Sequence, residues 1–402
     1  MIAQQTTTTD ILISGGGVAG LAAAAAFGTA GFRVICVDPE PPVMSDAESG
    51  ADLRTTAFLQ PSIPVLRAAG LWDRLEPYAE ALHIMRIIDA GGAVTEPRLT
   101  KDFNAADISD LPFGWNLPNW LLRREMVARL EDLPNVDFRP GIATRHLMTR
   151  TGEAMVTLSN GARIRARMVI AADGRNSVVR QALGIPVKTL RYGQKALAFA
   201  VSHPVPHQNV STEIHRSGGP FTLVPLPDRD GLPRSAVVWM ETGPEVARLQ
   251  ALPVAAFEAE MNTRSCHVLG PLTLASRVTV WPIISQIAER MAGARCALMA
   301  EAAHVVPPIG AQGLNMSMAD LTALLDLAQA APEDIGSPPM LDAYHTKRHL
   351  DVRARVTGID ALNRASMMGS QPLRDLRATA LNALYSAAPV RKTLMKAGLG
   401  IR

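Results

Sequence analysis

The sequence predicts an α/β fold: a Rossmann-like dinucleotide-binding domain, a second, mainly β-sheet substrate domain, and a C-terminal helical segment. Three observations predict it, namely a strand–glycine turn–helix–strand opening, a strand-rich middle section, and a helical pattern from residue 339 onward. A chain of 402 residues is too long for one ordinary core. We therefore expect a discontinuous dinucleotide-binding domain (1–80, 115–185 and 275–345), a sheet domain (81–114 and 186–274) and C-terminal helices (346–402).

The opening segment has the pattern of a βαβ unit. Asp10 to Ser14 reads as an apolar strand, and an alanine-rich helix from about Val18 to Ala30 follows it. Gly31 stands where a glycine commonly ends a helix. Arg33 to Val37 is a second apolar strand. The proline-rich stretch 39–50 after it predicts a loop.

Further elements follow from the hydrophobic periodicity. An Asn160-Gly161 pair between alternating segments predicts a hairpin. The expected helices cover 62–74, 123–132, 253–262, a long stretch from 313, and most of 339–402. The expected strands fall within 83–115, 135–173, 184–282 and 296–300.

Composition narrows the function classes. The net charge is +3, from 40 basic and 37 acidic residues, and no concentrated basic stripe indicates a nucleic-acid partner. The three cysteines, Cys36, Cys266 and Cys296, lie far apart, so we expect neither a disulfide framework nor a metal site. No signal-peptide pattern or long apolar span is visible, which favours a cytoplasmic protein.

The first motif is a Gly-x-Gly-x-x-Gly turn between the first strand and the first helix. The first glycine permits a tight turn, the second lets a pyrophosphate approach the backbone, and the third lets helix and strand pack closely. The helix N-terminus suits a phosphate, and an acid that closes the second strand suits ribose hydroxyls. The expected dinucleotide contacts are Gly15, Gly17, Val18, Ala19, Gly20 and Asp38.

The second motif follows the apolar strand that ends near residue 171. Asp173 and Gly174 form a short turn into a helix, and the glycine allows a ligand to approach closely. Arg180 offers a cation on that helix. The alternative is a plain Asp-Gly turn with a surface arginine.

The third motif runs from Ala300 to Asn315. A strand delivers Glu301 to the end of a sheet, where its carboxylate can accept hydrogen bonds from a polyol chain. Two prolines stiffen the segment, Gly310 and Gly313 allow a flat ligand to approach, and a helix N-terminus can stabilise negative charge on a ring. The expected contacts are Glu301, Gly310, Gly313 and the backbone N–H groups of Leu314 and Asn315.

Together the three motifs resemble those of the flavoprotein monooxygenases of the para-hydroxybenzoate hydroxylase type, whose FAD domain is of the Rossmann-like GR2 type. Asp173-Gly174 is similar to the family segment near both FAD and the nicotinamide cofactor. The third motif resembles the family's Gly-Asp motif, but here Ala300 and Glu301 replace the glycine and the aspartate. The resemblance also implies that Arg54 and Arg123 contact FAD; solvated arginines are the alternative.

The resemblance implies a reaction cycle and a role for the backbone. NADPH or NADH visits transiently and reduces the flavin, O2 adds to form a flavin C4a-hydroperoxide, and one oxygen atom passes to an aromatic ring. We expect the backbone at Pro308 and Gly310 to position groups near the flavin, and we assign no side-chain acid or base. Reading His304 as catalytic is less favoured than a structural role, and His203 and His207 have loop roles as the favoured interpretation.

Further segments look like the ubiquinone-biosynthesis hydroxylase branch of this family. They are 202–207, 211–213, 219–227, 238–239, Tyr344, Arg348, Asp351 and 389–400. The branch implies a polyprenylated phenol as substrate. The alternatives are a hydroxylase of a small soluble phenolic acid and a non-catalytic flavoprotein scaffold. The basic, apolar tail 373–402 suggests either a helix at the surface of the inner membrane, with association with a ubiquinone complex, or a helix packed on the body.

Overall fold

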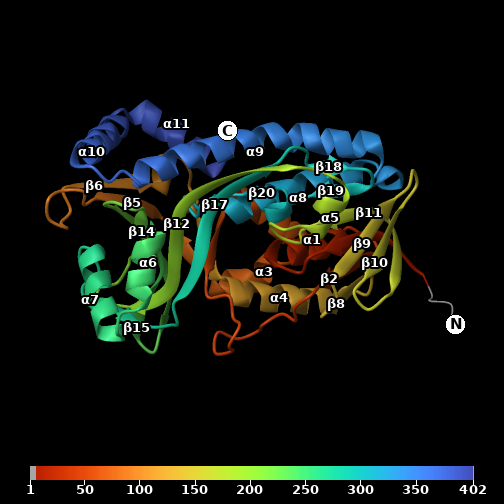
Figure 1. Ribbon diagram of the computed structural model, residues 1–402, viewed down its shortest axis with the longest axis horizontal. Helices are drawn as coiled ribbons and strands as arrows, with labels where there is room; N and C mark the ends of the chain where they lie inside the picture. Colours follow the sequence, from red (N-terminus) through yellow and green to blue (C-terminus); the bar gives the residue numbers. More distant parts are fainter. Residues whose placement is uncertain (1–5, 402) are drawn as a thin grey trace.

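A computed structural model describes residues 6–401, and one part of the molecule is a mainly parallel sheet covered by helices (Figure 1). The strand order is β18-β19-β11-β1-β2-β8, and β10 and β9 extend β11 as an antiparallel pair. The central β1 buries Ile11, Leu12 and Ile13 completely, as a strand covered on both faces must. The strands are β1 Thr7–Ser14, β2 Val34–Asp38, β8 Val136–Pro140, β9 Thr144–Thr149, β10 Ala154–Leu158, β11 Arg163–Ala171, β18 Ala292–Gly293 and β19 Cys296–Leu298.

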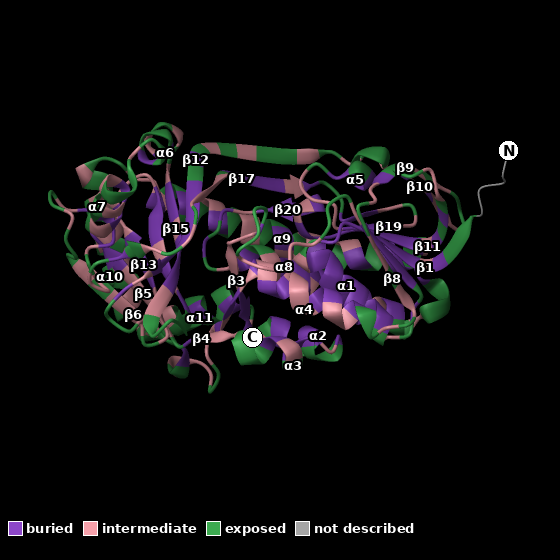
Figure 2. Ribbon diagram, turned by 90° about the horizontal axis from the view of Figure 1, so that it is seen from below, coloured by how far each residue is buried: buried purple, intermediate pink, exposed green. Residues whose placement is uncertain are grey.

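Helix α1 (Val18–Thr29) lies against this sheet and is almost entirely buried (Figure 2). Its alanines leave room for close approach, and it contacts α4 (Asn119–Glu131) and α8 (Gln312–Ala330). The expected βαβ opening and the Asn160-Gly161 hairpin between β10 and β11 are confirmed.

A second, nine-stranded sheet forms the other part of the molecule. Its order is β20-β17-β12-β15-β14-β13-β5-β6, and β16 pairs with β12. Helices α6 (Gly243–Gln250) and α7 (Val254–Arg264) pack against this sheet. Its strands are β5 Ile84–Asp89, β6 Leu99–Asn104, β12 Val187–Ser202, β13 Val210–His215, β14 Pro220–Arg229, β15 Leu232–Thr242, β16 Thr273–Leu274, β17 Thr279–Ala288 and β20 His304–Val305.

The long strands β12 and β17 run from one part of the molecule to the other (Figure 1). Strand β12 lies in the predicted sheet domain and β17 in the predicted dinucleotide-binding domain, but the two strands pair with each other in one sheet. The division into domains therefore stays a proposal.

Two predicted elements are wrong in detail. The helix expected over 62–74 is divided into α2 (Ile63–Ala68) and α3 (Trp72–Leu75), because Gly70 between them has a φ of +69° that a continuing helix does not allow. The strand expected over 296–300 ends at Leu298, and a short 3-10 helix (Ala300–Ala302) follows. A third, small sheet has the strand order β3-β7-β4. Its strands are β3 (Thr55–Leu59), β7 (Gly114–Pro118) and β4 (Glu80–Leu82).

The C-terminal part is helical, as predicted. The long α9 (Pro338–Ser366) runs along one edge of the molecule and leads to α10 (Gln371–Ser386) and α11 (Ala388–Leu399) (Figure 1). Among residues 6–401, no helix combines the length and the apolar character that crossing a bilayer requires.

Candidate functional site

The glycine turn of the first motif leaves room in front of α1. A side chain at Gly15, whose φ is +108°, would place its Cβ 2.3 Å from the Ala172 carbonyl oxygen, and one at Gly20 would lie 1.8 Å from the Gly15 oxygen. These two glycines are needed for packing. Gly17, in contrast, has no atom of the described residues within 4 Å of its Cβ position apart from its chain neighbours, and none of their side chains caps α1. Open space thus meets the N–H groups of a helix N-terminus, as a bound phosphate requires.

Asp38 lies at the end of β2, beside the glycine turn. Its Oδ2 accepts a hydrogen bond from the Gly16 N–H at 2.5 Å, and its Oδ1 accepts one from the Glu40 N–H at 2.9 Å. The sequence-predicted acid is therefore held next to the first residues of the motif by β2 and by the turn itself. Val18 and Ala19 form the first turn of α1 at the same place.

In the second motif, Asp173 caps α5 (Val178–Ala182). Its Oδ2 accepts hydrogen bonds from the N–H groups of Val178 at 2.9 Å and Val179 at 3.3 Å. Its Oδ1 is buried and has no hydrogen-bond partner among the described residues. Burial raises the pKa of this carboxyl, against the hydrogen bonds that Ser177 and the backbone supply. One oxygen atom is thus left available to a ligand, and the adjacent Gly174 has open space at its Cβ position.

Arg180 is buried and structural, so the alternative of a surface arginine is wrong. Its two terminal nitrogens donate to the carbonyl oxygens of Ala302 and Arg175, each at 2.8 Å. Only 4% of its surface is exposed, and burial lowers its pKa. Arg180 therefore ties the second motif to the third.

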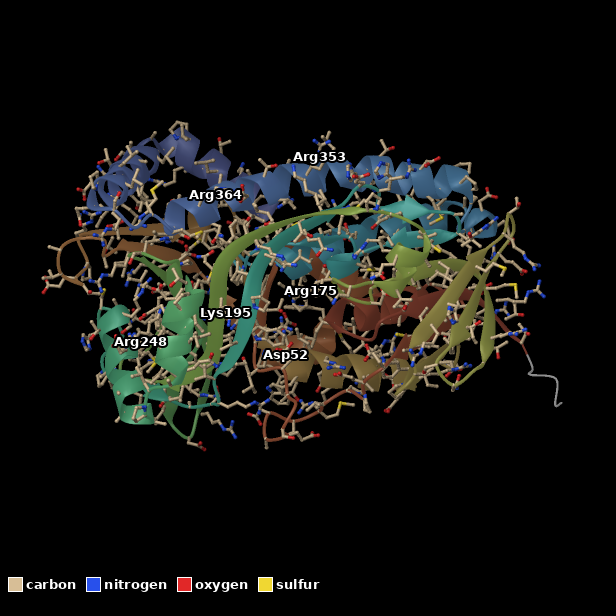
Figure 3. The ribbon with its side chains drawn as sticks, viewed as in Figure 1. Asp52, Arg175, Lys195, Arg248, Arg353 and Arg364 are labelled. Carbon is tan, nitrogen blue, oxygen red and sulfur yellow. The ribbon has the colours of Figure 1, made fainter. Side chains whose placement is uncertain are left out.

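The third motif brings Glu301 to the second motif. Glu301 lies in the short 3-10 helix, its side chain is 45% exposed, and its Oε2 accepts from Arg175 at 3.3 Å. Arg175 lies in the central part of the molecule, as does Asp52 (Figure 3). Glu301 also acts electrostatically on Arg54. The Glu301 carboxylate, which stands where related motifs have an aspartate, is therefore half exposed and interacts with two arginines from distant segments, Arg175 and Arg54.

The glycines of the third motif stand before α8. Apart from chain neighbours and the backbone of α8, the atoms nearest to the Cβ positions of Gly310 and Gly313 are Gln312 Nε2 at 3.8 Å and Val306 Cγ2 at 3.9 Å. Pro308 and Gly310 are exposed, whereas Pro307 and Ile309 between and before them are buried. Two alternate residues of this loop thus face away from the core.

Leu314 and Asn315 lie in the first turn of α8, as predicted. The Asn315 side chain is already engaged, because its oxygen accepts from the Leu59 N–H at 2.8 Å and its nitrogen donates to the Ala57 oxygen at 2.8 Å. It joins α8 to β3, a role that its sequence motif did not indicate.

The backbone conformation at Ala300 is one that glycine adopts more readily than alanine. Its φ is +54°, in the left-handed region, where a Cβ atom costs about 1–2 kcal/mol. We expect Ala300→Gly to stabilise the protein by roughly 0.5–1 kcal/mol, after the entropy that glycine adds to the unfolded chain is subtracted. Chemical denaturation measures this change.

Ala303 provides the matched control for that experiment. It ends the same 3-10 segment with a φ of −99°, which any residue adopts. Ala303→Gly should therefore destabilise by about 1 kcal/mol. Equal losses in both variants would show that the backbone at Ala300 carries no strain.

Arg54 is fixed at the entrance to β3. It binds Asp52 through two hydrogen bonds, of 2.8 and 2.7 Å, and its guanidinium lies 4.2 Å from the centre of the Trp281 ring. Burial would lower the pKa of Arg54, but the bonds to Asp52 and the charge of Glu301 raise it above the ordinary value. Sequence reasoning missed Asp52 and Asn119; the Asn119 amide donates to Asp52 Oδ2 at 3.0 Å.

Arg123 lies on α4, as expected, and is half-buried. Its Nε is buried and, among the described residues, has no hydrogen-bond partner. The structure does not bring it into an ion pair with another predicted site residue. Because buried polar atoms in proteins are nearly always hydrogen-bonded, Arg123 Nε is suited to donate a hydrogen bond to a bound ligand.

Three residues of the ubiquinone-branch resemblance, Tyr344, Arg348 and Asp351, take part in the hydrogen bonds that support the third motif. Arg348 donates to Asp320 at 2.8 Å and to Asp351 at 2.8 Å, and the Tyr344 hydroxyl donates to the Leu298 oxygen at 2.8 Å. The other oxygen of Asp320 bonds His304 Nε2 at 2.6 Å. His304 is therefore structural. Sequence reasoning missed Asp320; the signal for it is an acid that interrupts the apolar residues of α8.

His203 and His207 belong to the turns of the second sheet. His203 bonds the Ser235 hydroxyl and the Val205 oxygen at 2.9 and 2.8 Å. His207 bonds the Leu226 oxygen at 3.1 Å. Their partners fit the loop role that was favoured.

The three motifs therefore form one site that suits an extended dinucleotide. The turn at Gly17 and the two glycines of the third motif are open, and Asp173 Oδ1 and Arg123 Nε are buried without partners among the described residues. Arg180 and the Arg175–Glu301 pair hold the second and third motifs together. These features fit FAD: the helix N-termini suit its phosphates, and the carboxylates suit its hydroxyl groups.

Comparison with known proteins identifies the class. Residues 8–358 match the family model described as an FAD binding domain. The chain belongs to this family, and it is a flavoprotein monooxygenase that binds FAD.

Relatives are similar over almost the whole chain. Ubiquinone hydroxylase UbiL of Rhodospirillum rubrum is 31% identical, over 94% of this chain and 86% of that protein. The 3-demethoxyubiquinol 3-hydroxylase of Escherichia coli is 28% identical, over 94% of this chain and 95% of that protein. The p-nitrophenol 4-monooxygenase PnpA of Pseudomonas putida superposes with a TM-score of 0.81 at 20% identity, over 99% of this chain and 100% of that one, which shows the shared fold.

Proposed function

We propose that this chain hydroxylates the ring of a polyprenylated phenol in ubiquinone biosynthesis, with FAD as cofactor and NADPH or NADH as electron donor. The observation that carries the proposal is the end-to-end similarity to two ubiquinone-pathway hydroxylases of different bacteria. The residues that support the third motif, the buried Tyr344 and Arg348 and the half-buried Asp351, are among the residues of the branch resemblance, so the similarity extends into the site.

In this proposal FAD lies across the three motifs. The turn at Gly15, Gly17 and Gly20 and the first turn of α1 hold the pyrophosphate, and Asp38 lies near a ribose. The remaining contacts are Arg54, Arg123, Asp173, Gly174, Glu301, Gly310, Gly313, Leu314 and Asn315. Ala311 precedes α8, and no side chain caps that helix, so its free N–H groups can stabilise negative charge on the ring system.

The bound flavin supplies the redox chemistry with O2, and the protein supplies position and surroundings. The exposed Pro308 and Gly310 stand where the loop faces away from the core, and we propose that their backbone positions the substrate ring against the flavin. The rigid prolines also help to exclude water.

The C-terminal helices support a location at the membrane. Helix α10 turns Arg377 inward to Asp89 at 3.0 Å, while Leu373, Leu376 and Leu384 remain 46%, 59% and 47% exposed. Within α10 and α11, only Met395 and Leu399 are buried. An outward apolar stripe beside basic residues suits an anionic bilayer, in which a polyprenylated substrate would reside.

We expect the protein to cosediment with vesicles that contain anionic lipid, and less with neutral vesicles. Lys392→Glu together with Lys396→Glu should weaken binding to these vesicles at least about 30-fold, because each basic residue contributes about 1 kcal/mol near an anionic surface. Lys188→Glu, at an exposed position of β12, is the control. Protein that stays in the supernatant with every vesicle would leave these helices without a membrane role.

A quinone profile of cells that lack the gene tests the pathway. We expect loss of ubiquinone and accumulation of an under-hydroxylated polyprenyl phenol, whose structure shows which ring carbon is the target. An unchanged ubiquinone pool in cells without a second hydroxylase would contradict the pathway. The search would then move to small soluble phenols.

A further inference from the structure

The loop of the third motif is bonded to the last helix of the chain through one side chain. Gln312 Nε2 donates to the Gly310 oxygen at 2.9 Å and also to the Gly398 oxygen at 2.9 Å. Gly310 belongs to the loop before α8, and Gly398 belongs to the end of α11. Gln312 is itself only 9% exposed. One buried amide thus contacts two segments that are far apart in the sequence, since Gln312 and Gly398 are separated by 86 residues.

The other end of this amide is held from α9. Gln312 Oε1 accepts a hydrogen bond from Arg355 Nη1 at 2.8 Å, which fixes which end of the amide faces the two carbonyl groups. Arg355 in turn binds Asp351 at 3.1 Å. A Cβ atom at Gly400 would lie 2.7 Å from Arg355 Nη2, so the end of α11 packs directly on this arginine.

The same network reaches the beginning of the third motif. Asp351 binds Arg348, Arg348 binds the fully buried Asp320, and Asp320 binds His304. The Ala300 N–H lies 3.4 Å from Asp320. Both ends of the motif are therefore bonded to one network, and within residues 6–401 the end of α11 meets that network at Gln312 and Arg355.

We propose that Gln312 is a positioning residue through which docking of α11 sets the geometry of the flavin-facing loop. Burial of Met395 and Leu399 docks α11, and the two hydrogen bonds that Gln312 donates transmit the position of α11 to Gly310. A partner that draws α11 away from the body would thereby loosen the FAD site. The inference rests on the proposed contact between this loop and FAD.

The test measures FAD dissociation constants by flavin fluorescence, together with the visible circular dichroism of the bound flavin, and it needs no substrate. Gln312→Met removes all three hydrogen bonds, Gln312→Glu keeps only the contact with Arg355, and Leu399→Ser undocks α11. Each variant should weaken FAD binding about tenfold and change the flavin dichroism. Leu394→Ser, at a 52% exposed position of the same helix, should leave both unchanged.

A double variant distinguishes transmission from general damage. If α11 acts through Gln312, then Gln312→Glu with Leu399→Ser should bind FAD no more weakly than either single variant. Losses that multiply to about a hundredfold, or single variants that bind FAD as the wild type does, would overturn the inference. Failure of the wild-type protein to bind FAD would instead contradict the proposed site itself.

Discussion

Replacing Gly17 by valine is expected to weaken FAD binding at least about 100-fold, or roughly 2.7 kcal/mol, while the protein keeps its fold. The position has open space on the protein side and an extended backbone, with φ −70° and ψ 177°, which valine adopts readily. The side chain would occupy the space in which the pyrophosphate must approach the N–H groups of α1. Isothermal titration with FAD and thermal unfolding without it measure the two effects.

Two other glycines make this result specific. Gly20→Val should disrupt the fold itself, because its Cβ would lie 1.8 Å from the Gly15 oxygen. Gly358→Val, at an exposed position of α9 with equally open space, should change neither folding nor FAD binding. Wild-type FAD affinity in Gly17→Val would show that the cofactor does not lie on this turn.

Replacing Asp320 by asparagine is expected to cost about 3–5 kcal/mol of stability, because it removes the charge that compensates a buried cation. Asp320 is fully buried and bonds both His304 and Arg348. Urea unfolding measures the loss. Asp326→Asn on the same helix breaks an exposed pair with Lys347, and it should cost less than about 1 kcal/mol. Equal effects in the two variants would mean that the buried pairing contributes little.

The same residue gives a dependence on pH. Burial would raise the pKa of Asp320, but His304 and Arg348 hold it below the ordinary value. The unfolded chain therefore takes up the proton first as the pH falls. The stabilisation is complete above the ordinary carboxyl pKa, about 4, and is lost as the pH falls through the lower folded value. Asp320→Asn should flatten the stability curve in this acid range, and an unchanged slope would contradict the assignment.

Local patterns made the cofactor part of the site predictable. The turn at Gly15 to Gly20 and the acid at Asp38 lie within one βαβ unit, so their relation follows from short-range geometry. The strand before Asp173 and the helix after Gly313 are likewise read from neighbouring residues. Backbone requirements such as these leave a mark in the sequence, because few residues satisfy them.

Contacts between distant segments were not predictable in the same way. Arg180 donates to a carbonyl group 122 residues away in the sequence, and Arg348 on α9 donates to Asp320 on α8. The left-handed backbone at Ala300 is also hidden, since alanine gives no sign of a positive φ. Gly70 could have indicated the break in the helix expected over 62–74, but some helices tolerate an internal glycine, and the sequence does not distinguish the two cases.

The most direct test of the function is a single-turnover reaction under 18O2 with purified, FAD-loaded protein, NADPH or NADH, and a short-chain 3-demethoxyubiquinol or a less hydroxylated precursor. Mass spectrometry of the product then shows the source of the new oxygen atom. We expect one 18O atom in the ring hydroxyl of the product with one of these substrates, and none with Gly17→Val. Oxidation of the nicotinamide cofactor without labelled product from any of these precursors would contradict the proposed hydroxylation.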